Sequence, residues 1–107
     1  MDTLQKFRLD QRVAIITGGA GLLGLQHARA IADAGGIPIL WDINGPAAIA
    51  QAQGIKERYP VDCQGLEVDI TSPEAVKGAL AKVVASFGKV NILINNAAND
   101  PKVAPGG

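Results

Sequence analysis

The sequence predicts an α/β fold in which a parallel β-sheet is built from a β-α-β-α-β-α-β succession. Four short apolar segments alternate along the chain with three segments of helical periodicity. The first apolar segment, 13–16, is a near-continuous run of the kind that is buried on both faces of a parallel sheet. A glycine-rich stretch follows it directly, which places a sharp turn between the first strand and the first helix.

Composition limits the classes of protein and partner. The chain has 107 residues, which is one domain at most, and its formal net charge of zero gives no electrostatic footprint for nucleic acid or an anionic membrane. A lone cysteine, Cys63, excludes an internal disulfide and fits a reducing compartment. The sequence shows neither a membrane-length apolar run nor the apolar core of a signal peptide. We therefore predict a cytoplasmic protein without nucleic-acid or membrane partners.

The first half of the chain supplies two strands joined by a helix. The first strand is expected at 12–17, and the helix that follows spans about 22–34. That helix ends where Gly35 can adopt the left-handed closing conformation. The second strand covers 37–41 and ends at Asp42, ahead of a turn.

The second half repeats this alternation. A helix is expected over about 46–58, followed by a strand at 65–70 in which apolar and acidic residues alternate. The third helix starts within 71–74, where either hydroxyl can cap it, and ends at Gly88. The fourth strand covers 90–94. Right-handed crossovers then give the spatial order 3-2-1-4, the first half of the doubly wound pattern.

The stretch after the first strand carries the main functional signal. From Gly19 it reads G-x-G-x-x-G, in the strand-to-helix setting that allows a pyrophosphate to meet a helix N-terminus. Gly21 is expected at the point where backbone and pyrophosphate approach closely, and Gly24 where helix and sheet pack closely. Glycines also mark ordinary tight turns, so the motif depends on its context.

That context resembles the short-chain dehydrogenase/reductase family. Thr17-Gly18 at the end of the first strand is similar to the start of the family's coenzyme loop, and the lead-in from Phe7 is similar to the family's N-terminus. The resemblance runs through four motifs, from Phe7 to Ala98. It implies a Rossmann-type fold, an incomplete doubly wound half-domain over residues 1–107 that binds NAD.

Asp42 points to the kind of dinucleotide. It lies 18 positions after Gly24 at the end of the second strand, close to where a carboxylate accepts the ribose hydroxyls of NAD. A 2′-phosphate at that place would face like-charge repulsion, which favours NAD over NADP. The alternative is that Asp42 only caps a turn.

Two further pairs carry the resemblance. Asp69-Ile70, at the end of the third strand, resembles the acid-plus-aliphatic pair that holds the adenine ring, although Asp69 can instead contribute to the cap before the third helix. Asn95-Asn96-Ala97-Ala98 resembles the family's Asn-Asn-Ala-Gly motif, with Ala98 replacing its glycine, although two asparagines can also form an ordinary turn. The predicted cofactor contacts are Gly18, Gly21, Leu22, Leu23, Gly24, Asp42, Ile43, Asp69, Ile70, Asn95, Asn96 and Ala97.

The catalytic group of the family has no counterpart in this stretch. The resemblance implies a Ser and a Tyr-x-x-x-Lys pair, aided by an Asn, all beyond position 107. The only tyrosine, Tyr59, is followed four residues later by Cys63, not by lysine. We therefore predict no catalytic and no metal-binding residue here, and a small-molecule substrate only where a C-terminal half is present.

Several alternatives stay open. Leu22 stands where the main branch of the family has glycine, and the resulting spacing resembles the extended branch, which includes nucleotide-sugar epimerases and dehydratases. A stand-alone nucleotide-binding module without catalysis is a second alternative. A receiver-like domain lacks its acidic cluster here, and a P-loop lacks its Lys-Ser or Lys-Thr. In the order 3-2-1-4 the apolar fourth strand is an exposed edge, so we also expect self-association through it.

Overall fold

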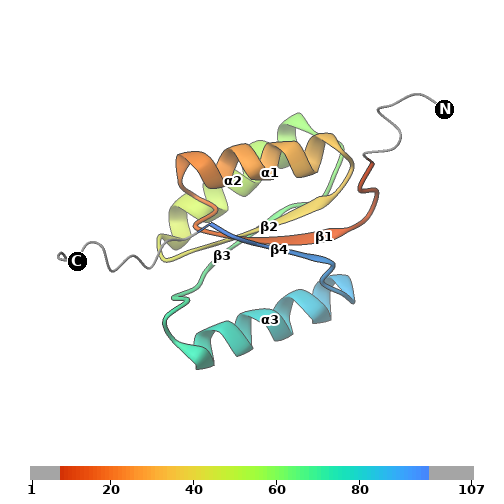
Figure 1. Cartoon of the computed structure of the whole chain (residues 1–107). Helices are drawn as coiled ribbons and strands as arrows, with labels where there is room; N and C mark the ends of the chain where they lie inside the picture. Colours follow the sequence, from red (N-terminus) through yellow and green to blue (C-terminus); the bar gives the residue numbers. More distant parts are fainter. Residues whose placement is uncertain (1–7, 97–107) are drawn as a thin grey trace.

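The computed structural model describes residues 8–96. Their four strands form a parallel sheet in the order β3-β2-β1-β4, which confirms the predicted topology (Figure 1). The elements are β1 (Val13–Thr17), α1 (Leu22–Asp33), β2 (Ile37–Asp42), α2 (Gly45–Arg58), β3 (Gln64–Glu67), α3 (Pro73–Phe87) and β4 (Ile92–Asn95). Within the described residues, no helix is both long enough and apolar enough to span a bilayer.

Three layers enclose two hydrophobic clusters. Helices α1 and α2 cover one face of the sheet and α3 covers the other (Figure 1). Ile16 and Leu40 point to the α1 and α2 face, whereas Ile15 and Ile39 point to the α3 face. All five residues of β1 are buried, as expected for a central strand with neighbours on both edges and both faces. The centre of the sheet is therefore fixed from four sides.

The third strand is shorter than expected. It ends at Glu67 instead of reaching position 70, although the Val68 N–H still donates to the Asp42 carbonyl oxygen at 2.9 Å. The chain then turns, because an Asp69 carboxylate oxygen accepts hydrogen bonds from the N–H (2.9 Å) and the hydroxyl (2.6 Å) of Thr71. This local turn competes with the extended conformation that the alternating pattern predicted.

The fourth strand begins two residues later than expected. Asn91 precedes it and makes two bonds to Val13: its N–H donates to the Val13 carbonyl oxygen at 2.9 Å, and its side-chain oxygen accepts from the Val13 N–H at 2.9 Å. A side chain therefore takes over one bond that a strand backbone would otherwise make. The pairing with β1 continues regularly from Ile92 to Asn95.

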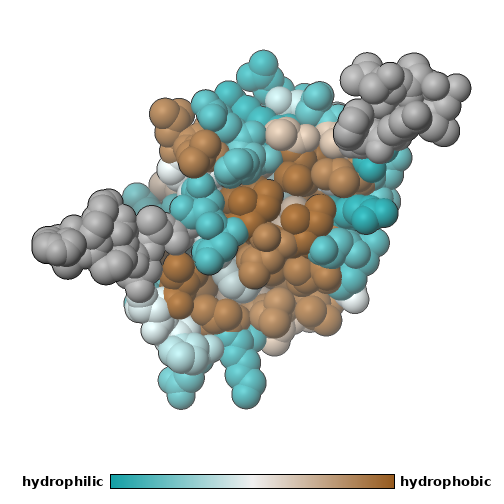
Figure 2. All heavy atoms as spheres, viewed as in Figure 1, coloured by the Kyte–Doolittle hydropathy of each residue, from teal (hydrophilic) through white to brown (hydrophobic). Residues whose placement is uncertain are grey.

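The side of the sheet next to β4 is the least covered. Leu93 of β4 is 64% exposed, and Leu80 and Val84 of α3 are 41% and 45% exposed. Figure 2 shows hydrophobic side chains gathered over β4 and the adjoining side of α3. We call Leu80, Val84 and Leu93 the β4 patch.

Candidate functional site

The predicted site lies where β1 ends. A loop of residues 18–21, called here the glycine-rich loop, connects β1 to α1 at the carboxyl edge of the sheet (Figure 1). Because all four strands are parallel, their carboxyl ends meet at this same edge. Asp42 at the end of β2 and Asn95 at the end of β4 thus flank the loop from either side. The fold brings the main predicted residues together.

Two glycines give the loop its path. Gly18 has a φ of 67°, in the left-handed region that glycine adopts without strain. Gly19 passes so close to β2 that a Cβ atom on it would lie 2.8 Å from the Leu40 Cβ. The Gly19 N–H donates to the Trp41 carbonyl oxygen at 3.0 Å, so the start of the loop continues the pairing of β1 with β2.

Gly24 and Gly21 have different surroundings. A Cβ atom on Gly24 would overlap the Gly18 carbonyl oxygen and lie 2.8 Å from the Gly19 Cα, so the close packing of α1 against the loop requires glycine there. A Cβ atom on Gly21 would meet only the Gly18 oxygen, at an ordinary 3.5 Å. The protein's own packing therefore leaves the space at Gly21 open, as a backbone that receives a ligand closely would require.

The N-terminus of α1 is also left open. Asn44 caps α2 by accepting from the Ala47 N–H at 3.1 Å, and Ser72 caps α3 by accepting from the Ala75 N–H at 3.2 Å. Gly21, the N-cap residue of α1, has no such side chain, and the first turn of α1 carries no acidic residue. Within the described residues, α1 alone thus presents an uncapped, partially positive end to solvent.

The apolar residues predicted around this end are exposed. Leu22 and Leu23, in the first turn of α1, are 79% and 55% exposed, and Ile43 after β2 is 69% exposed. Exposed large side chains of this kind supply apolar contact area to a ligand where they surround a polar site. Leu22 and Leu23 lie at the uncapped end of α1, and Ile43 directly follows Asp42 in the chain.

Asp42 connects the loop to the start of α2. One carboxylate oxygen accepts from the Ala20 N–H at 3.0 Å and the other from the Asn44 N–H at 2.9 Å. Each oxygen keeps a further lone pair for an outside donor. The turn-forming role that was the alternative for Asp42 is therefore present, and the acceptor capacity that ribose hydroxyls would use is present beside it.

The asparagines at the end of β4 are tied to β1 and the loop. The Thr17 hydroxyl donates to the Asn95 side-chain oxygen at 3.1 Å. The Asn96 side-chain amide donates to the Gly18 carbonyl oxygen at 3.4 Å. Ala97 and Ala98 lie outside the described residues.

Asp69 and Ile70 have defined structural roles. The hydrogen bonds from Thr71 lower the pKa of the exposed Asp69 carboxyl and hold it in the turn before α3. Ser72, not Asp69, is the residue that caps α3. Ile70 packs against the hydrophobic cluster on the α3 face. The adenine contact expected of this pair stays a prediction.

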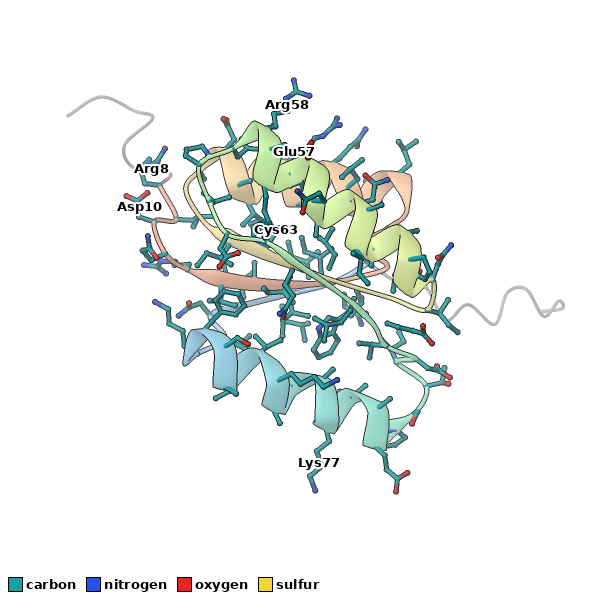
Figure 3. The ribbon with its side chains drawn as sticks, turned by 180° about the vertical axis from the view of Figure 1, so that it is seen from behind. Arg8, Asp10, Glu57, Arg58, Cys63 and Lys77 are labelled. Atoms are coloured by element: carbon teal, nitrogen blue, oxygen red, sulfur yellow. The ribbon has the colours of Figure 1, made fainter. Side chains whose placement is uncertain are left out.

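The remaining chemistry-bearing residues lie elsewhere. A hollow of about 860 Å³ at the amino ends of β1 and β2 is lined by Tyr59 and Asp62, among others. Arg8 lies beside Asp10 near these strand ends (Figure 3). The Arg8 Nη2 and Asp10 Oδ1 atoms form an ion pair at 2.7 Å. Cys63 lies inside the layer between α2 and the sheet, where burial raises the pKa of its thiol to about 12 (Figure 3). The residues at 8–96 contain no cluster of three or more His, Cys, Asp or Glu that could hold a metal ion.

Sequence reasoning missed the backbone groups that complete the site. The Ala20 and Asn44 N–H groups donate to Asp42, and the Trp41 carbonyl oxygen accepts from the Gly19 N–H. The two-residue spacing from Asp42 to Asn44 is the one available signal, because an aspartate often accepts from the N–H two residues on.

Comparisons with known proteins agree with this geometry. The sequence model of the short chain dehydrogenase family matches residues 12–105. The chain is 41% identical over 86 residues to the NAD(+)-dependent 2-dehydro-3-deoxy-L-rhamnonate dehydrogenase of a Sphingomonas species, covering 80% of this chain and 32% of that protein. It spans about a third of the length of the curated relatives it matches.

Two solved structures show the same fold with different dinucleotides. An NAD+-bound xylitol dehydrogenase superposes with a TM-score of 0.79 at 35% identity, covering 87% of this chain and 35% of that one. The L-sorbose reductase of Gluconobacter frateurii, in complex with NADPH and L-sorbose, superposes with a TM-score of 0.82 at 31% identity, covering 87% and 35%. Proteins of this fold thus hold either cofactor.

Proposed function

Because the chain belongs to the short-chain dehydrogenase family, we propose that it supplies the dinucleotide-binding part of an oxidoreductase. That oxidoreductase transfers a hydride between a nicotinamide and an alcohol or carbonyl substrate. The main observation behind this proposal is the open space at Gly21 beside the uncapped end of α1, which the protein's own packing does not fill. Residues 1–107 form this NAD-binding half-domain in our proposal, and the Ser and Tyr-x-x-x-Lys group belongs to a segment beyond them.

Each predicted residue has a task in this proposal. Gly18, Gly21 and Gly24 shape the loop and the helix end so that backbone N–H groups face the pyrophosphate. Leu22, Leu23 and Ile43 give apolar surface around it, and Asp42 accepts the ribose hydroxyls. Asp69 and Ile70 hold the adenine. Asn95 and Asn96 border the path toward the nicotinamide, which supplies the hydride when bound, and Ala97 stays a predicted cofactor contact.

We infer a preference for NAD over NADP from charge. Asp42 places a carboxylate at the end of β2, and the loop itself contains no lysine or arginine that could pair with a 2′-phosphate. A second negative group at this place would be repelled. The NAD(+)-dependent relative supports this preference, whereas the NADPH complex of a structural neighbour shows that the fold alone does not dictate it.

A non-catalytic role is the second candidate. Tyr59, the only tyrosine of the chain, lines the hollow at the edge opposite to the glycine-rich loop, so it is not available as a proton donor there. A nucleotide-binding module without turnover would fit this placement. The relatives described above are dehydrogenases and reductases, which favours the oxidoreductase over a nucleotide-sugar epimerase.

We also propose self-association. The β4 patch lies at one of the two outer strands of the sheet, and β4 has no partner strand on its outer side among the described residues. An unpaired apolar edge is a template for pairing with a second chain.

The substrate of the complete enzyme is set, in our proposal, by residues that these 107 do not include.

The test compares two matched glycine substitutions. NADH is titrated while the fluorescence of Trp41, the only tryptophan, is followed in the unaltered chain and in Gly21→Val and Gly54→Val. Neither position has a neighbour closer than 3.5 Å to an added Cβ atom, so both variants should fold. We expect Gly21→Val to weaken NADH binding by about tenfold or more, because the side chain occupies the space of the pyrophosphate. Equal binding by both variants, or none by the unaltered chain, would overturn the proposal.

A further inference from the structure

The glycine-rich loop is held in place by few groups. Three of its four residues are glycines, and glycine has more backbone freedom than any other residue type. Backbone hydrogen bonds hold it from the Gly19 N–H to the Trp41 oxygen, from the Gly21 N–H to the Gly18 oxygen and from the Leu25 N–H to the Gly21 oxygen. Two side chains also bond to the loop: the Asn96 amide donates to the Gly18 carbonyl oxygen at 3.4 Å, and the Asp42 carboxylate accepts from the Ala20 N–H at the shorter distance of 3.0 Å.

Asp42 is also fixed from its other side. Its second oxygen accepts from the Asn44 N–H at 2.9 Å, and Asn44 in turn caps α2. The carboxylate therefore links the loop to the start of a helix more than 20 residues further along the chain. Because one oxygen serves each segment, no neutral side chain of the same length can satisfy both N–H groups.

We propose that Asp42 is a positioning residue for the glycine-rich loop as well as a contact for the ribose. It holds the Ala20 N–H, and with it the backbone from Gly19 to Gly21, in the shape that receives the pyrophosphate before the dinucleotide arrives. This inference rests on the proposed function. The inference goes beyond the proposed function because the Asp42 carboxylate then contributes to dinucleotide binding even where the ligand has no ribose hydroxyl.

A ligand without these hydroxyls separates the two roles. The probe is an NAD analogue that carries 2′,3′-dideoxyadenosine in place of adenosine. If Asp42 only accepts ribose hydroxyls, Asp42→Ala weakens NAD binding and leaves binding of the analogue unchanged. If Asp42 also positions the loop, Asp42→Ala weakens the analogue too, and we expect a loss of about tenfold, as for one lost hydrogen bond.

Two further variants control this measurement. Asp62→Ala makes the same change of charge, and Asp62 also accepts from a backbone N–H, that of Cys63 at 2.9 Å, but it lines the hollow at the opposite edge. It should leave the binding of both ligands unchanged. Asp42→Asn keeps one acceptor oxygen for one of the two N–H groups, so the analogue should bind with an affinity between those of the unaltered chain and Asp42→Ala.

Amide hydrogen exchange gives a readout that needs no ligand. In Asp42→Ala, exchange at Ala20 and Gly19 should accelerate several-fold, whereas exchange at Ile15 in the buried strand β1 should stay slow. Accelerated exchange at Ile15 would mean that Asp42→Ala unfolds globally. The exchange rates at Ala20 and Ile15 in Asp42→Asn then decide whether Asp42 positions the loop.

The outcomes distinguish the two proposals. If the unaltered chain binds neither NAD nor the analogue, the proposed function fails, while the exchange rate at Ala20 still tests the positioning role. The other outcome is that NAD binds, but Asp42→Ala has the same affinity for the analogue and the same exchange rate at Ala20 as the unaltered chain. The positioning role is then overturned, and the proposed function stands.

Discussion

Gly24 in α1 lies directly against the carbonyl oxygen of Gly18, so closely that a Cβ atom on Gly24 would overlap that oxygen. The contact joins the first turn of α1 to the start of the glycine-rich loop. We expect Gly24→Ala to lower the free energy of unfolding by about 1–3 kcal/mol, because the loop backbone cannot move away without losing its pairing with β2. Urea denaturation measures this change.

Gly54→Ala is the control for that prediction. Gly54 lies in the interior of α2, and an added Cβ atom would meet nothing within 4 Å. Alanine there should raise the free energy of unfolding by about 0.5–1 kcal/mol through helix propensity. A similar stability change in both variants would contradict the packing argument.

Asn91→Ala should destabilise the junction of β1 and β4. The substitution removes the oxygen that accepts from the Val13 N–H, and Val13 is fully buried, so this donor is left without an acceptor. The expected loss is about 1–3 kcal/mol in the free energy of unfolding. Asn91→Asp keeps an acceptor at the same place and should retain most of the stability. Thermal denaturation of both variants decides whether the side chain or only the backbone of Asn91 matters.

The raised pKa of the buried Cys63 thiol predicts that the folded state loses stability at alkaline pH. Burial raises the pKa of this thiol from 9.0 to about 12, so the folded state favours the protonated form. The contribution of Cys63 to the free energy of unfolding is therefore complete below about pH 9. It is lost as the pH rises from 9 toward 12, because over this range the unfolded chain releases the thiol proton and the folded chain keeps it. The difference in unfolding free energy between the unaltered chain and Cys63→Ala should shrink over this window. A constant difference would show that the thiol is not desolvated as the structure indicates.

Self-association through the β4 patch should depend on Leu93. Leu93→Lys places a charge on the edge strand, which disfavours pairing with a second chain. Light scattering should show a mass that rises with protein concentration for the unaltered chain and rises less for the variant. Ile49→Lys makes the same change on α2, where Ile49 is 60% exposed, and should leave the association unchanged. An unaltered chain that stays monomeric at high concentration would contradict the proposal.

The preference for NAD should depend on ionic strength. We expect NADH to bind about tenfold or more tightly than NADPH at low salt, since Asp42 repels the 2′-phosphate. Added salt screens this repulsion, so the ratio of the two affinities should fall. In Asp42→Ala the ratio should approach one at every salt concentration. Equal affinities for the unaltered chain would remove the charge argument.

The order of the elements could be predicted because its signals are local. The apolar run before Gly18 and the stop at Gly35 act over a few residues, and the structure has helices and strands at these places. The end of β3 and the start of β4 could not be predicted, for two different reasons. At the end of β3 the local turn of Asp69 with Thr71 competes with the alternating strand pattern. At the start of β4 the Asn91 side chain bonds to the distant Val13 N–H.

The candidate site was predictable in its residue types more than in its contacts. Asp42 stands out as the acid that ends β2, 18 positions after Gly24, and Gly21 by its place in G-x-G-x-x-G; the parallel sheet brings the two to the same end of the strands. The bond between Asp42 and the Ala20 N–H has no sequence signal, because any residue except proline can supply that N–H. Asp69 shows the opposite case: its bonds to Thr71 are local, and they favour the turn that was the alternative for it.

The unlike surroundings of Gly21 and Gly24 have a consequence for mutational tolerance. A library of all substitutions at these two positions, scored once for cellular abundance and once for retention on an immobilised dinucleotide, should separate them. Variants at position 24 would be depleted in both screens, because they fold poorly. Variants at position 21 would survive the first screen and fail the second. The same motif would thus contain one glycine kept for the fold and another kept for the ligand.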